Sequence, residues 1–305
     1  MKATARLGLL WSLLAMLALP VVAQAQYDYT TNGGAIMIVK YLGPGGSVSL
    51  PGTMNVASND LPVTDIGAGA FEGCAGLTGV TIPDSVTNIG YKAFMGCTSL
   101  SSVTLGNRLI RIGDWAFWGC TRLTGVTIPD SVTSIADLAF AHCSTLTSVR
   151  IGSRVTSIGV GAFSSCISLT GLTMGSRVAS IGNWAFYNCS SLTGVTIPDS
   201  VTRIGYKAFL NCGSLTAVTI PSTVISIGDW AFSRCTQLTS VHFNGAASSL
   251  GKFVFYDDPI RPESSSPSVL GNSEETGSDR ASELPPGQAR QSLHNWKPKG
   301  RGLRW

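Results

Sequence analysis

Eight cysteines are the residues with the clearest capacity for chemistry, and they recur at a fixed spacing of 23 residues. They occupy positions 74, 97, 120, 143, 166, 189, 212 and 235. Thiols at such a spacing could form disulfides, ligate a metal or supply a nucleophile. Each of these chemistries requires further residues, whose presence can be checked in the sequence.

The sequence lacks the further ligands that a metal centre requires and the paired base that a catalytic thiol requires. There is no CxxC pair, and the three histidines, His142, His242 and His294, lie in unrelated contexts, so we expect neither a metal site nor a cofactor. His142 directly precedes Cys143, but the other seven cysteines lack such a neighbour, which disfavours a thiol nucleophile. The sequence also contains no GxSxG, HExxH or GK[ST] motif. We therefore predict that the protein is not an enzyme.

The cysteines are predicted to form one ladder inside a repetitive core. Each follows a phenylalanine by three residues, and each phenylalanine follows an alanine, as in Ala93, Phe94 and Cys97. Cysteines stacked about 5 Å apart lie within disulfide range, but side chains that point the same way would have to turn towards each other to bond. Buried free thiols are therefore favoured, and disulfides between adjacent repeats are the alternative.

The element that must position these residues is a 23-residue unit, for which Thr78 to Leu100 (TGVTIPDSVTNIGYKAFMGCTSL) serves as the pattern. A partial unit begins at Leu61, full units run from 78–100 to 216–238, and a decayed last unit ends at Asp258. A period in the twenties is typical of a solenoid in which each unit forms one coil. The LxxVxI stretch predicts one strand per coil, and these strands stack into a parallel sheet.

The rest of the unit predicts how the coil returns. Ile89 and Gly90 begin a return segment, and Tyr91 to Cys97 is long enough for one or two helical turns, with Phe94 filling the space behind the sheet. The predicted fold class is an α/β solenoid of leucine-rich-repeat type. It has a parallel sheet on one face and short return segments with helical turns on the other.

The frame LxxVxIPxxVxxIGxxAFxxCxxL, as found from Leu192 to Leu215, resembles the BspA-type leucine-rich repeat. The resemblance covers about residues 61–258, and the opening YTTNGG…GPGG…LPVTDIGAGAF is similar to the N-terminal region of secreted bacterial members. It implies a leucine-rich-repeat solenoid in an exported or surface-displayed protein. Some members of this family bind host matrix proteins or other cells.

The two ends of the chain differ from the repeats in composition. Residues 1–25 are predicted to be a signal peptide cleaved after Ala25, because a basic start precedes an apolar run and the small-residue site Ala23-Gln24-Ala25. Residues 26–60 contain strand-like runs around an Asn-Gly hairpin signal at Asn32, and they predict a β-rich cap on the solenoid of residues 61–258. Residues 259–305 are rich in Pro, Ser, Glu and Gly and predict a disordered tail.

The composition limits where the protein acts and what it contacts. Only 12% of the residues are charged, and the net charge of +4 is scattered along the chain, which argues against a nucleic-acid surface. No stretch after the signal peptide is long and apolar enough to span a membrane. We expect a protein that is secreted or held at the cell surface.

The candidate binding residues are those that project outward from the predicted strands and from the turn after them. Between the inward positions of Val80 and Ile82, the outward column holds Thr81, Thr104, Thr127, Arg150, Thr173, Thr196, Thr219 and His242. On the following turn, Arg108, Arg154 and Arg177 share one repeat position. Threonine at exposed strand positions can simply reflect β-propensity, and scattered charges can be an ordinary solvated edge. The sharper hypothesis is a binding face, with Arg150 and His242 as specific contacts and the arginines contacting an anionic partner.

The function predicted from the sequence is recognition of an extracellular protein or polysaccharide through the repeat surface. Uniform surface columns favour a repetitive partner over a small molecule, because so regular a stack offers no deep pocket. The alternative is a purely structural envelope or matrix protein. A remote option is binding of ice or a crystalline glycan by the threonines.

Overall fold

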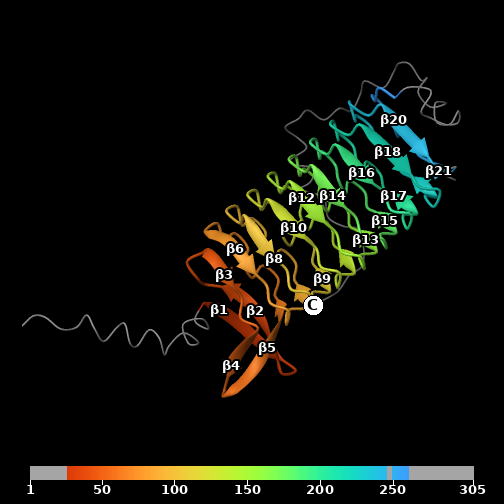
Figure 1. Cartoon of the computed structure of the whole chain (residues 1–305). Helices are drawn as coiled ribbons and strands as arrows, with labels where there is room; N and C mark the ends of the chain where they lie inside the picture. The colour runs from red at the N-terminus through yellow and green to blue at the C-terminus, as the bar shows by residue number, and fades with distance from the viewer. Residues whose placement is uncertain (1–25, 246–248, 261–305) are drawn as a thin grey trace, which may run out of the picture.

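The computed structural model describes residues 26–245 and 249–260, and these residues wind into a solenoid of stacked coils (Figure 1). Each coil advances by 23 residues and contributes one strand to each of two faces. The predicted signal peptide (1–25) and most of the predicted tail (259–305) lie outside the described residues.

The LxxVxI stretches form the parallel strands that the sequence predicts, on what we call the sheet face. Val80 and its equivalents point inward while Thr81 and its equivalents point outward, because successive side chains of a strand alternate. The strands form three consecutive groups of three along this face (Figure 1). These are β3 (Gly46–Ser49), β6 (Leu77–Thr81) and β8 (Ser102–Thr104); β10 (Gly125–Thr127), β12 (Ser148–Arg150) and β14 (Gly171–Thr173); and β16 (Gly194–Thr196), β18 (Ala217–Ile220) and β20 (Ser240–Phe243).

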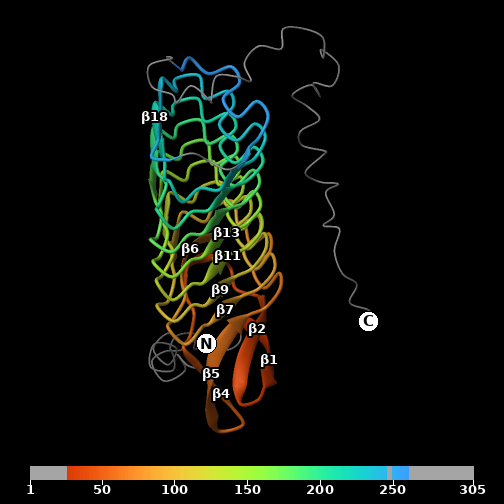
Figure 2. The ribbon, with the colours of Figure 1, turned by 90° about the vertical axis from the view of Figure 1, so that its right-hand side faces the viewer.

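A second sheet, which the sequence analysis did not predict, runs through the positions assigned to the return segment. The sheet has twelve strands, and we call it the long sheet. Figure 2 shows β7 to β13 of this sheet one above another. Its strands are β1 (Tyr27–Asn32), β2 (Ala35–Tyr41), β4 (Thr53–Val56), β5 (Asn59–Ile66), β7 (Asn88–Ile89), β9 (Arg111–Ile112), β11 (Ser134–Ile135), β13 (Ser157–Ile158), β15 (Ser180–Ile181), β17 (Arg203–Ile204), β19 (Ser226–Ile227) and β21 (Ser249–Leu250).

The expectation of helical turns from Tyr91 to Cys97 is wrong, since the described residues contain no helix. The N–H groups of Lys92, Phe94 and Gly96 donate across to carbonyls of the next coil, at 2.7–2.9 Å. The N–H groups of the residues between them donate to the carbonyl three residues earlier and so close β-turns. Lys92 and Gly96 have positive φ angles of 55° and 70°, which a right-handed helix excludes.

The core between the faces contains a continuous stack of phenylalanine rings. Phe94, Phe117 and Phe140 are fully buried, and their ring centroids lie 5.0 Å apart with nearly parallel planes. This confirms that phenylalanine fills the interior, and the ring spacing measures the rise of one coil.

The N-terminal strands extend both faces of the solenoid. β1 and β2 form a hairpin whose two central residues are Gly33 and Gly34, with φ angles of 57° and 80°, and not Asn32, which pairs with Ala35. β2 pairs in parallel with β5 of the long sheet, and β3 pairs in parallel with β6 of the sheet face. The ring of Tyr41 stacks on Phe71 at 4.9 Å and so continues the phenylalanine stack.

Candidate binding surface

The outward column of the sheet face is built by strand register. We call it the threonine column, and its members are Thr81, Thr104, Thr127, Arg150, Thr173, Thr196, Thr219 and His242. Thr127, Arg150 and Thr173 lie directly beside one another in β10, β12 and β14. All eight side chains are exposed. The structure therefore brings together the first group of predicted site residues on one flat face.

Hydrogen bonding distinguishes the threonine column from its neighbour on the same face. In the neighbouring column, hydroxyls donate to a carbonyl of the preceding coil, as Thr124 does to Ser101 (3.2 Å) and Thr147 does to Thr124 (2.9 Å). In the part of the chain that the structure describes, no hydroxyl of the threonine column makes such a bond. These hydroxyls are thus available to a ligand, whereas those of the neighbouring column hold coils together.

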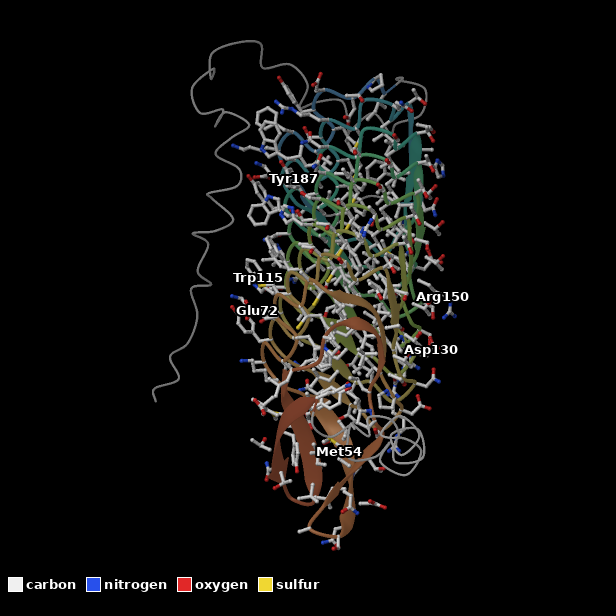
Figure 3. All side chains as sticks on the ribbon, turned by 90° about the vertical axis from the view of Figure 1, so that its left-hand side faces the viewer. Met54, Glu72, Trp115, Asp130, Arg150 and Tyr187 are labelled. Carbon is white, nitrogen blue, oxygen red and sulfur yellow. The ribbon has the colours of Figure 1, made fainter. Side chains whose placement is uncertain are left out.

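Arg150 projects from the centre of the threonine column, on the same side as Asp130 (Figure 3). Hydrogen bonds from Ser153 lower the pKa of Asp130, and the positive charge of Arg150 lowers it further. Arg150 forms no ion pair within the described residues. Its guanidinium can therefore offer all its N–H donors to a partner.

The arginines of the following turn are exposed, and two of the acids near them accept hydrogen bonds from the backbone. Asp84 accepts a hydrogen bond from the N–H of Asn107 (2.6 Å), and Asp130 accepts one from Ser153 (2.7 Å), each in the next coil. Arg154 and Arg177 lie in adjacent coils, and Arg108 lies two coils before Arg154. A shallow hollow between the threonine column and this turn is lined by residues that include Thr173, Met174, Thr196 and Asp199.

The cysteines form the predicted ladder of free thiols. All eight are unbonded to one another, and every one except the half-buried Cys74 is buried. From Cys97 to Cys235, each Sγ donates to the carbonyl of the phenylalanine 26 residues earlier, at 3.0–3.4 Å. Burial raises the pKa of Cys97, Cys166 and Cys212 to about 12. These thiols are therefore protonated and inert at neutral pH.

The His142–Cys143 neighbours do not form an activated pair. Burial raises the pKa of Cys143 well above its ordinary value, and its thiol donates to the carbonyl of Phe117. The ring of His142 instead lies edge-on to Trp118, at 5.3 Å between centroids. No group of three or more His, Cys, Asp or Glu side chains that could hold a metal ion occurs among the described residues.

A second surface, which the sequence analysis missed, lies on the edge opposite Arg150. Figure 3 shows Trp115 and Tyr187 projecting there, away from the side that carries Arg150 and Asp130. We call this edge the aromatic ridge, and its rings are Tyr91, Trp115, Trp118, Trp184, Tyr187, Tyr206, Trp230, Phe253 and Tyr256. The available signal was the recurrence of Trp and Tyr at the variable positions around the invariant Ala-Phe pair.

Comparison with known proteins identifies the repeat. A family model described as "BspA type Leucine rich repeat region (6 copies)" matches residues 64–193 and 156–264. No curated protein matches the chain in sequence.

One solved bacterial structure shares the architecture, and a second is similar to the chain in sequence. A leucine-rich cell surface protein from Faecalibacterium prausnitzii is 33% identical over 77% of this chain and 74% of its own, with a TM-score of 0.61. A leucine-rich repeat protein from T. pallidum is 27% identical over 79% of this chain and 90% of its own, with a TM-score of 0.45. No helix among the described residues is long and apolar enough to cross a membrane.

Proposed function

The chain belongs to the BspA-type leucine-rich repeat family, and we propose that it is an exported, non-enzymatic recognition module. In this proposal, the sheet face binds an extracellular protein or polysaccharide. Export is supported by the signal-like residues 1–25 and by the similarity to a cell surface protein of F. prausnitzii. We also propose residues 26–60 as the cap of a repeat array that spans residues 61–258.

One observation supports this role above the others: the threonine column presents polar groups that nothing else in the described structure uses. A structural stack does not require free hydroxyls, because the neighbouring column already bonds one coil to the next. Arg150 adds a cation in the middle of the flat face, and it forms no ion pair with any described residue. Charged groups of this kind guide partner choice and the rate of association.

The expected partner is extended and carries acidic groups. Arg150, Arg154 and Arg177 lie on two adjacent coils, and Asp130, which the charge of Arg150 affects, already accepts a hydrogen bond from the N–H of Ser153. Association led by exposed arginines weakens with salt, because the Debye length falls from about 10 Å at 0.1 M to about 3 Å at 1 M.

The experiment that tests this proposal is a screen of the mature chain against immobilised extracellular matrix proteins and a glycan array. Arg150→Ala should weaken the captured interaction about tenfold and flatten its salt dependence. Arg122→Ala is the matched control, since it removes one exposed arginine of the same array outside the threonine column. Absence of binding together with self-assembly of the chain would instead support the structural alternative. Equal effects of the two variants would argue against a specific role of Arg150 in the threonine column.

A further inference from the structure

The aromatic ridge carries large side chains where the backbone favours none. Each full coil has a residue with positive φ directly before its Ala-Phe pair, such as Trp115 (61°) and Trp230 (60°). The fourth coil uses Gly161 (59°) at the same position. Bulky residues rarely adopt this conformation, and glycine adopts it freely. The backbone therefore does not explain the tryptophans.

The ridge contains one arrangement twice, five coils apart. Lys92 Nζ lies 5.1 Å from the ring centroid of Tyr91 and 5.8 Å from that of Trp115 in the next coil. Lys207 Nζ lies 5.0 Å from Tyr206 and 5.9 Å from Trp230. We call these two groups the cation–aromatic stations. Each lysine is within the range at which a cation is attracted to an aromatic face, so it restrains the rings that it bridges.

Each station also has an oriented hydrogen-bond acceptor. Asp114, which precedes Trp115, accepts the N–H of Asp137 through Oδ1 at 3.0 Å. Asp229, which precedes Trp230, accepts the N–H of Lys252 through Oδ1 at 2.8 Å. Both carboxylates are exposed, so the second oxygen of each faces solvent in a defined direction.

We propose that the aromatic ridge binds a linear neutral polysaccharide and that the two cation–aromatic stations engage separate stretches of one chain. A pyranose ring has an apolar C–H face, which packs on an aromatic ring, and hydroxyls at its rim, which a carboxylate oxygen accepts. Each station carries one lysine and one aspartate, and this charge balance suits a neutral chain.

The shape of the ridge favours a narrow polymer over a folded protein. A stable protein interface buries about 800 Å² on each partner and centres on a packed patch. The stations instead lie one after the other along the solenoid. In the coils from one station to the next, the ring centroids of successive phenylalanines are 5.0–5.5 Å apart. Two like stations match a ligand that repeats its own structure. This site is separate from the sheet face and does not depend on the function proposed for it.

The test is electrophoresis of the mature chain in native gels that contain hydroxyethylcellulose, glucomannan or arabinoxylan. At least one polymer should slow the wild-type protein. The double variant Trp115→Gly with Trp230→Gly should migrate as it does without polymer, because glycine suits the backbone there as Gly161 does. Each single variant should lose about tenfold or more in apparent affinity, since tethering to one station assists binding at the other.

The matched control is the double variant Ile110→Ala with Ile225→Ala, which removes exposed apolar side chains (51% and 55% exposed) from the same two coils. It should stay retarded, as should Arg150→Ala, and retention on polymer-coupled resin should survive about 1 M NaCl. Failure of all three polymers to slow the wild-type chain would overturn the proposal, as would unchanged retardation of the double tryptophan variant. Equal melting temperatures of the wild type and the variants would show that the changes in migration and in retention report binding and not loss of folding.

Discussion

Phe140→Ala tests whether the phenylalanine stack holds the solenoid together. Phe140 is fully buried, and its ring centroid lies 5.0 Å from Phe117 and 5.4 Å from Phe163, with interplanar angles of 5° and 4°. Truncation of a buried phenylalanine costs about 3–5 kcal/mol in free energy of unfolding. Contacts to coils on both sides are lost together, so we expect a value in the upper half of this range.

Phe255→Ala in the last described coil provides the comparison. Its ring is only partly buried and stacks on one ring of the phenylalanine stack, that of Phe232, at 5.6 Å between centroids. Repeat proteins are stabilised by contacts between neighbouring coils. We therefore expect Phe255→Ala to cost about half as much as Phe140→Ala, at roughly 2 kcal/mol.

Urea unfolding monitored by circular dichroism measures both costs as shifts in midpoint at constant slope. A cavity in the middle of the array can also uncouple the two halves, and this would appear as a second transition or a reduced slope. Ile110→Ala, at an exposed position, should change stability by no more than about 0.5 kcal/mol. A cost below about 2 kcal/mol for Phe140→Ala with an unchanged slope would refute the reasoning, as would equal costs at Phe140 and Phe255.

Three further predictions concern a half-buried acid, the thiols and a glycine. Burial raises the pKa of Asp258 to about 8, so the folded state binds its proton more tightly, and stability falls as pH rises from about 4 to about 8. Melting curves should show Asp258→Asn to be more stable than the wild type at pH 8 but not near pH 4, and parallel pH profiles would contradict this. Iodoacetamide, counted by mass spectrometry, should label only Cys74 in the native state and all eight thiols in denaturant; native labelling of all eight would rule out the buried ladder. Gly45 has a φ of 99°, and an added Cβ would lie 2.5 Å from the Gly76 carbonyl, so Gly45→Ala should cost about 1–3 kcal/mol in urea unfolding. Gly194→Ala, where nothing lies within 4 Å, should be nearly neutral, and equal costs would argue against the steric explanation.

The sequence predicted the period, the inward positions of Val80 and Ile82, and the buried phenylalanines, because strand alternation and core burial leave direct traces in residue type. It did not reveal the long sheet, whose strand in each coil is as short as Asn88–Ile89. Two residues cannot display an alternation. Their pairing becomes visible only when the register between coils is known.

The error over Tyr91 to Cys97 has a related cause. Its length and residue types are compatible with a helical turn, but solenoid stacking offers each second N–H a carbonyl in the next coil. Those bonds between coils require positive φ at Lys92, a conformation that local propensity disfavours. Tertiary hydrogen bonding thus decided the local conformation, and with it the alignment of the aromatic ridge.

The sequence predicted where the candidate binding residues lie, but not which of their hydroxyls are free to bind a ligand. Strand alternation placed Thr127 on the surface, yet Thr124 is an equally exposed threonine in the same coil. Only the structure shows that Thr124 donates to Ser101, whereas Thr127 has no such bond. Residue type therefore could not separate a threonine that stabilises the stack from one that can meet a ligand.

The division between the repeated core and the variable surface makes the two proposed binding surfaces separable by mutation. Phe117 and Cys120 lie in the core of the same coil that carries Trp115 on its edge, and both are fully buried. Because coils contact mainly their neighbours, removal of an outward side chain leaves the core stack in place. Arg150 and Trp115 project from opposite edges (Figure 3). If a variant at one edge loses binding of a partner while a variant at the other edge keeps it, the first edge is the surface that binds that partner.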